Sequence, residues 1–188
     1  MADTPDGPVL LATLARNWWM VGARGALAIL FGLALLLRPA VPLNLLVALF
    51  GLYAALDGAW AIASALWVTR MSFVAWPVLF EGVASLVVGA LALGWPLVPR
   101  ELVHAIAAWG LITGALEIIA AARLPRAGAG YWLLATGGVF SLFLAVIILI
   151  LPHASQPSVV GALGVYALAF GALLAAAAVW LLRSLPEP

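Results

Sequence analysis

The chain has 188 residues, of which 67% are hydrophobic and 8% charged, and its mean hydropathy is +1.23. Because a soluble domain carries about 25% charged residues, this composition excludes an ordinary water-soluble protein and predicts one that is solvated by lipid. The net charge of +1 gives no sign of a nucleic-acid-binding surface, and the absence of cysteine excludes disulfides, thiol chemistry and thiolate metal sites.

Six segments, taken in chain order, are long and apolar enough to cross a membrane, which needs about 20 residues. They cover residues 18–38, 43–67, 74–95, 101–122, 131–151 and 159–182. The first segment recurs downstream as part of a repeat, so we expect it to be retained and not cleaved as a signal peptide. Proline-bracketed links at 39–42, 96–99 and 152–157 indicate sharp helix-to-helix turns. We therefore predict an all-α membrane protein with six transmembrane helices.

The same pattern of paired helices occurs three times. The first helix of each pair carries a gapless pattern that begins at residue 24, 81 or 137, which are 57 and 56 residues apart. The second helix contains YAALDG (53–58), WGLITG (109–114) or YALAFG (166–171). A fixed period of this size indicates one supersecondary unit used repeatedly. We predict a short N-terminal segment (1–16) and three tandem helical hairpins (17–70, 71–126 and 127–184), pseudo-threefold about the membrane normal, in one membrane domain.

The arginines predict the orientation. All eight basic residues are arginines; with the N-terminus inside, five lie on the cytoplasmic side (Arg16, Arg70, Arg123, Arg126 and Arg183), two lie outside (Arg38 and Arg100), and Arg24 falls within a helix. The positive-inside rule therefore predicts that both termini are cytoplasmic. Tryptophans near helix ends fit the aromatic belts of a membrane protein; they are Trp18, Trp19, Trp67, Trp95, Trp132 and Trp180.

Small residues recur at positions i, i+3 and i+7 in every helix, which places them on one face. In lipid, such faces let helix backbones approach closely. The glycines expected to serve in this packing are Gly25, Gly32, Gly51, Gly58, Gly82, Gly89, Gly114, Gly138, Gly164 and Gly171. Six helices that meet through glycine leave little room for a wide central pore. We therefore expect bulky residues such as Phe31, Leu35 and Trp60 to face lipid or another subunit, and the deeper Trp60 and Trp109 to serve in packing.

Four charged residues fall inside the predicted spans, where charge is costly and marks candidate sites. Arg24, Asp57 and Glu81 each lie 15 residues from the proline of an outer link, which places all three on one level, about 22 Å deep. Glu117 lies about one turn deeper and shares a face with Thr113, the repeat equivalent of Asp57. We expect Arg24 to pair with Asp57 or Glu81. With one arginine and three acids, we also expect at least one acid to be protonated near neutrality.

Three interpretations of this polar layer remain open: a structural clamp that fixes helix register, a proton-linked function, and an anionic or polar ligand at Arg24. The third repeat has Gly137 and Phe170 where the others have charges, so the layer is lopsided. This asymmetry fits a specific site or an interface better than a symmetric ion pathway.

Two histidines, His104 and His153, lie near the predicted outer surface, where they are either interfacial polar residues or sensors of mild acidification. Glu101 and His104 match half of a di-metal motif that needs two copies, so we expect no metal. We also expect no cofactor. The sequence lacks HExxH, G-x-S-x-G and phosphate-binding glycine loops, and we expect the protein not to be an enzyme.

The segments NWWMVGARGALAILFGLALLLRP (17–39), FGLYAALDGAWAI (50–62) and GALEIIAAARL (114–124) resemble the HdeD family of small bacterial inner-membrane proteins, which are described by a short repeat of unknown function. The likeness covers about residues 17–184. It implies acid or envelope stress tolerance and supplies no molecular mechanism. We therefore expect a non-enzymatic membrane scaffold that binds lipid and a second copy or other membrane proteins. The alternatives are a proton-linked transporter or proton-leak modulator and, less favoured, an accessory subunit of a larger membrane complex.

Overall fold

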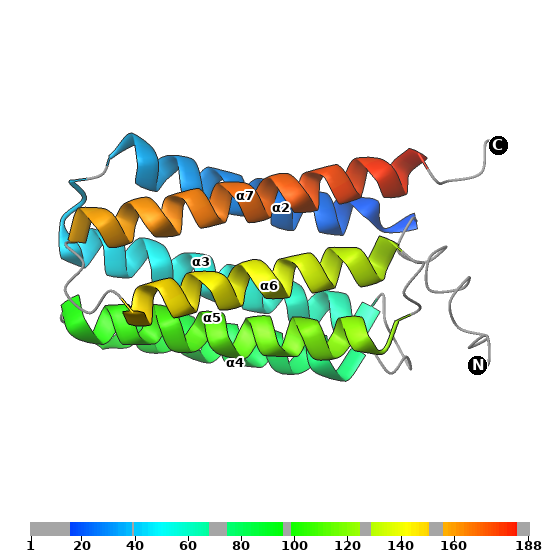
Figure 1. Ribbon diagram of the computed structural model, residues 1–188, viewed down its shortest axis with the longest axis horizontal. Helices are drawn as coiled ribbons and strands as arrows, with labels where there is room; N and C mark the ends of the chain where they lie inside the picture. The colour runs from blue at the N-terminus through cyan, green and yellow to red at the C-terminus, as the bar shows by residue number, and fades with distance from the viewer. Residues whose placement is uncertain are drawn as a thin grey trace.

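The computed structural model describes residues 16–38, 40–67, 75–95, 99–124, 129–150 and 156–183. Within these residues the chain forms six long α-helices and no strand (Figure 1); they are α2 (Trp18–Leu37), α3 (Leu43–Trp67), α4 (Ala75–Gly94), α5 (Pro99–Ala122), α6 (Ala129–Ile150) and α7 (Gln156–Arg183). All six are long and apolar enough to cross a membrane. The chain is therefore an all-α membrane protein with six spans, as its composition predicted.

The predicted helix boundaries lie within three residues of those in the structure, and proline is involved in two of the differences. The helix α3 covers 43–67 as predicted, whereas α5 and α7 begin two or three residues earlier, at Pro99 and Gln156. Pro99 and Pro157 were interpreted as link residues. Proline fits the first turn of a helix because the N–H groups there have no partner within the helix, so both prolines belong to the helices that follow them.

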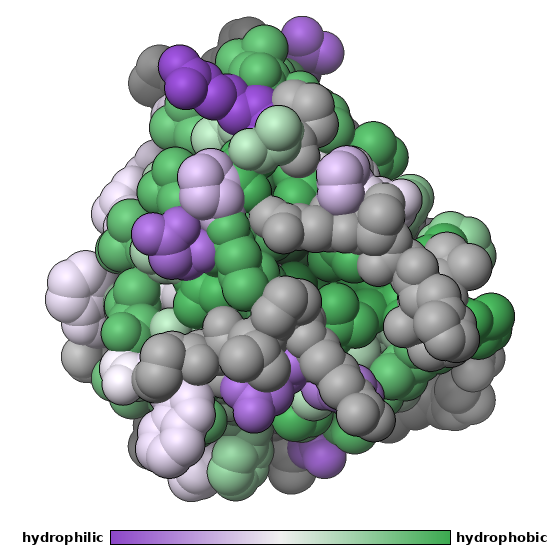
Figure 2. All heavy atoms as spheres, turned by 90° about the vertical axis from the view of Figure 1, so that its left-hand side faces the viewer, coloured by the Kyte–Doolittle hydropathy of each residue, from purple (hydrophilic) through white to green (hydrophobic). Residues whose placement is uncertain are grey.

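The six helices run alternately up and down, so that α2 begins and α7 ends at the same end of the bundle (Figure 1). The closest packing joins α2 to α7, α3 to α4, and α5 to α6. Each pair therefore combines the first helix of one repeat with the second helix of a neighbouring repeat, and the α2–α7 pair closes the ring. Viewed from the end at which α2 and α4 end and α3 and α5 begin, the bundle has a roughly triangular outline (Figure 2).

Glycine makes these close pairs possible. All ten glycines predicted to serve in packing form five reciprocal contacts: Gly25 with Gly171, Gly32 with Gly164, Gly51 with Gly89, Gly58 with Gly82, and Gly114 with Gly138. A Cβ atom built at Gly58 would lie 2.5 Å from the backbone nitrogen of Leu86. Backbone meets backbone there, which only glycine allows. The repeats are therefore joined to one another mainly through their glycine faces.

The bundle axis is filled by bulky side chains, and the prediction that Phe31, Leu35 and Trp60 face lipid or another subunit was wrong. Phe31 and Leu35 are 7% and 0% exposed. Trp60 is partly buried and donates its indole N–H to the carbonyl oxygen of Met20 at 2.8 Å. The reason is geometric: glycine faces close the three outer pairs, not the axis, so large side chains must fill the space between the pairs.

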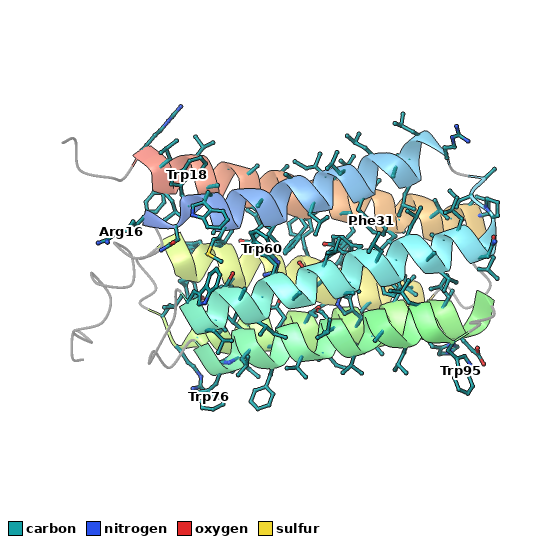
Figure 3. All side chains as sticks on the ribbon, turned by 180° about the vertical axis from the view of Figure 1, so that it is seen from behind. Arg16, Trp18, Phe31, Trp60, Trp76 and Trp95 are labelled. Carbon is teal, nitrogen blue, oxygen red and sulfur yellow. The ribbon has the colours of Figure 1, made fainter. Side chains whose placement is uncertain are left out.

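Exposed aromatic and aliphatic side chains cover the outside of the helices, as expected for a surface in contact with lipid. Figure 3 shows Trp76 and Trp95 near opposite ends of α4, where both point away from the bundle; they are 62% and 63% exposed. Trp95 is one of the predicted belt residues, whereas Trp76 was not predicted; among the rest, Trp19, Trp67, Trp132 and Trp180 are exposed and Trp18 is half-buried. Their positions near helix ends fit aromatic belts at the two membrane surfaces.

Candidate functional site

The polar layer, which we define as Arg24, Asp57, Glu81, Thr113 and Glu117, contains an ion triplet. The Arg24 Nε and Nη2 atoms donate to the two carboxylate oxygens of Asp57 at 2.6 and 3.0 Å. Nη2 also donates to Oε1 of Glu81. Asp57 and Glu81 are 1% and 2% exposed. The sequence left the partner of Arg24 open between these two acids; the structure brings both to it, which ties α2 to the α3–α4 pair.

The helix packing explains why these three side chains meet. Each of them immediately precedes a packing glycine, namely Gly25, Gly58 or Gly82. The Gly58–Gly82 contact brings the backbones of α3 and α4 together, so the carboxylates of Asp57 and Glu81 emerge side by side. A planar guanidinium can donate to both at once, which a lysine ammonium does less well.

Phe170 also contacts the arginine. The Arg24 Cζ atom lies 5.7 Å from the centre of the Phe170 ring, a distance at which a cation is attracted to an aromatic face. Phe170 is the repeat equivalent of Asp57 and Thr113. The sequence analysis noted Phe170 only because it replaces a charged residue. In the structure its ring packs against the Arg24 guanidinium.

Thr113 and Glu117, both on α5, take no part in the hydrogen bonds of the ion triplet. The Thr113 hydroxyl donates to the Trp109 carbonyl oxygen at 2.9 Å, within its own helix. Glu117 is 3% exposed, and among the described residues its Oε2 atom has no hydrogen-bond partner. A Cβ atom built at Gly137 would lie 3.2 Å from this oxygen, so the Glu117 carboxyl is packed against a glycine.

A second layer, which the sequence analysis did not predict, lies between the polar layer and the predicted outer surface. Tyr53, Trp109 and Tyr166 occupy equivalent positions in the three repeats and are all buried; we call them the aromatic layer. The Trp109 ring centre lies 6.0 Å from that of Tyr53 and 6.3 Å from that of Tyr166. The signal was present in the first letter of YAALDG, WGLITG and YALAFG.

Two serines hold this aromatic layer in place. The Trp109 indole N–H donates to Ser85 Oγ at 2.8 Å, and the Ser141 and Tyr166 hydroxyls lie 2.8 Å apart in a hydrogen bond. The aromatic residues are four positions before Asp57, Thr113 and Phe170, so they lie about 6 Å nearer the predicted outer surface. Large rings therefore fill the axis between that surface and the polar layer.

The remaining candidate residues are not part of this layer. His104 is exposed near the beginning of α5, 13 residues before Glu117. His153, Arg70 and Arg126 lie outside the residues that the structure describes. At 1.5 Å per residue, the separation along α5 places His104 about 20 Å from Glu117.

The charges of the layer define its chemistry. Arg24 (+1), Asp57 (−1) and Glu81 (−1) sum to −1, and an ionised Glu117 would bring the total to −2. A buried cluster of this kind can fix helix register through its ion pairs, or it can take up a proton. No bond-breaking chemistry follows from the hydrogen bonds and ion pairs of the described residues.

Comparison with known proteins gives a family without an assigned activity. The family described as "Short repeat of unknown function (DUF308)" matches residues 23–94 and again residues 80–150. No curated protein and no solved structure matches the chain. Each family match runs from the first helix of one repeat to the first helix of the next, and together the two matches cover well over half of the sequence. The chain therefore belongs to this family of short membrane repeats of unknown function.

Proposed function

We propose that this protein is a non-enzymatic scaffold or partner-binding element of the bacterial inner membrane that contributes to acid or envelope stress tolerance. The observation that carries the proposal is the filled axis. The aromatic layer occupies the centre of the bundle, and the Nε and Nη2 atoms of Arg24 donate to Asp57 and Glu81. Because these side chains contact one another along the axis, they favour a rigid bundle without a pathway for a solute. The stress role itself comes from the resemblance to the HdeD family.

The partners of such a scaffold are lipid and other membrane-embedded helices, which include a second copy of this chain. The arginine distribution favours a cytoplasmic position for both termini. The exposed aromatic residues Trp76 and Phe80 on α4 have ring centres 6.3 Å apart and lie on the outside of the bundle. They form a compact surface on which another helix could pack. Nucleic acid is not expected as a partner, because the net charge is only +1.

Survival of an acid challenge tests this function when it is measured together with membrane abundance. The test uses cells that carry Arg24→Gln, Glu81→Gln or the surface variant Trp76→Leu/Phe80→Leu, with Phe143→Leu on α6 as an exposed control. A scaffold is supported if the surface variant loses survival at normal abundance while the control survives. Normal survival of the surface variant, together with lost survival of Glu81→Gln at normal abundance, contradicts it.

A proton-linked transporter or leak modulator is the second candidate, and one observation favours it. The buried layer holds three carboxyl groups for one arginine, and Glu117 Oε2 has no hydrogen-bond partner among the described residues. This candidate predicts a pH-dependent flux in proteoliposomes that Glu81→Gln alters. Proteoliposomes that conduct no more protons or solute than protein-free vesicles would exclude it.

A further inference from the structure

Glu117 differs from the other two buried acids in what surrounds it. Asp57 and Glu81 both accept hydrogen bonds from the Arg24 guanidinium. Glu117 is as deeply buried, at 3% exposure, and its Oε2 atom lacks any hydrogen-bond partner among the described residues. An ionised carboxylate in this position would lose its hydration and would be compensated only in part, by the Ser141 hydroxyl and the charge of Arg24.

The space for this carboxyl exists because the third repeat departs from the pattern of the other two. Arg24 and Glu81 are repeat equivalents, and the third position is Gly137. A Cβ atom there would lie 3.2 Å and 3.4 Å from the two Glu117 carboxyl oxygens and 3.1 Å from the Phe170 ring. Even an alanine would press on both side chains. Glu117, which aligns with Ala61 and Leu174 in the other repeats, therefore reaches from α5 into the place that Gly137 leaves open.

The charged and ionisable groups that face Glu117 come from several helices. Arg24 of α2, Asp57 of α3 and Glu81 of α4 act on it electrostatically, and its own charge acts on Tyr53 of α3 and Tyr166 of α7. From α6 the neighbours are Gly137 and Ser141, neither of which ionises, although the Ser141 hydroxyl is a hydrogen-bond partner of the Glu117 carboxyl. The Arg24 Nε and Nη2 atoms are occupied by the other two acids, and the ion triplet carries a net charge of −1. A second negative charge at Glu117 is therefore disfavoured, and a neutral carboxyl is favoured.

We propose that Glu117 is a proton-binding site inside the bundle and that its carboxyl group carries a proton at neutral pH. The carboxyl group fits at this position because residue 137 is a glycine. The ligand is a proton and not a metal ion. Metal ions such as Ca²⁺ and Mg²⁺ need several oxygen ligands, whereas the neighbouring Ser141 hydroxyl is already bonded to Tyr166 and Arg24 brings a positive charge close by. This site stands independently of the proposed scaffold function, because a carboxyl can hold a proton whether or not the proton crosses the membrane.

Infrared spectroscopy of the full chain in a detergent without ester groups tests this site directly. A protonated carboxylic acid has a carbonyl stretch that neither a carboxylate nor an amide shows. At neutral pH we expect this band in the wild-type protein, its loss in Glu117→Gln and its retention in Asp57→Asn and Glu81→Gln. The band should fade as the pH is raised. Absence of the band from the wild type, or its persistence in Glu117→Gln, would overturn the proposal.

Stability gives a second readout from the same variants. A glutamine has the shape of a protonated glutamate, so we expect Glu117→Gln to unfold at nearly the wild-type temperature, as does the Gly161→Ala control, where an added Cβ meets open space. Failure of Glu117→Gln to fold while Gly161→Ala folds normally would mean that the negative charge is needed, and would contradict a neutral carboxyl.

Chemical labelling of the wild-type protein makes the test independent of any variant. The O–H group of a protonated acid adds across one C=N bond of a hydrophobic carbodiimide, and the resulting O-acylisourea rearranges to a stable N-acylurea. Peptide mapping of this adduct then identifies the protonated residue. We expect the adduct on Glu117 at neutral pH. An adduct on Asp57 or Glu81 alone, or on none of the three acids, overturns the proposal. Suppression of the adduct by Na⁺ at constant pH would assign the site to a metal ion and overturn it as well.

Discussion

At the close helix pairs, glycine meets glycine in much the same way in every repeat, whereas the polar layer receives different groups at equivalent positions. Gly25, Gly82 and Gly138 each contact a glycine of a neighbouring repeat. The residues directly before them are arginine, glutamate and glycine. The repeated part of the sequence therefore makes the architecture, and the part that departs from the repeat makes the chemistry. Substitutions in the two regions should consequently differ in their effects.

The largest effect is expected from Arg24→Gln, which removes the cation of the ion triplet. Two buried carboxylates would then lack a counter-charge, and breaking a buried ion pair in this way costs about 3 kcal/mol or more. We expect a marked fall in the thermal unfolding temperature in nanodiscs, followed by tryptophan fluorescence.

The neutral combination Arg24→Gln/Asp57→Asn/Glu81→Gln is the matched control, because it removes the charges together. It should recover much of the stability lost in Arg24→Gln. If Arg24→Gln unfolds at the wild-type temperature, the ion triplet contributes nothing to the fold.

The next largest effect is expected from Gly89→Ala at the α3–α4 contact. The new Cβ would lie 2.5 Å from the backbone nitrogen of Ala55 and 2.7 Å from the carbonyl oxygen of Gly51. Because backbone atoms cannot rotate away, the helices must separate, at a cost of about 1–3 kcal/mol. Gly161→Ala is the control, since nothing lies within 4 Å of the added Cβ. Equal thermal stability of the two variants would show that close backbone approach is not required.

The smallest effect is expected from Ser85→Ala, which makes the second repeat resemble the first, where Ala28 is the equivalent residue. The Trp109 indole N–H would lose its acceptor at 2.8 Å, which costs about 1–2 kcal/mol for a buried donor. Ser64→Ala, on a half-buried part of α3, should change stability much less. Unfolding temperatures measured side by side distinguish the two, and a larger loss in Ser64→Ala would refute the role given to Ser85.

The sequence was sufficient for the six helices, the identity of the packing glycines and the association of Arg24 with its acids, because all of these follow from spacing along a helix. It was not sufficient to tell which helices pair. The face of α2 that carries Gly25 and Gly32 could pack equally well against its hairpin partner α3 or against α7 of the neighbouring repeat. The spacing of residues within α2 does not distinguish these two possibilities. The inward position of Phe31 and Leu35 depends on that choice, so it was missed as well.

The role of Gly137 could not be predicted for a related reason. Where the other repeats have an arginine or a glutamate, the third repeat has a glycine, which carries no side chain. The side chain that fills the resulting space belongs to another helix. Glu117 is not the repeat equivalent of Arg24 or Glu81, so alignment of the repeats does not bring it to Gly137. Only the packing of α5 against α6 does so.

The contact between α2 and α7 has a consequence for biosynthesis. Helices enter the membrane in the order of synthesis, so the face of α2 that carries Gly25 and Gly32 must wait, covered by lipid, until α7 arrives. Arg24, Asp57 and Glu81 are all synthesised before α5. The ion triplet can therefore join the first two repeats while the nascent chain is still an open ring. The α2–α7 seam is therefore the last to form, and a chain interrupted before α7 leaves the glycine face of α2 without its partner helix.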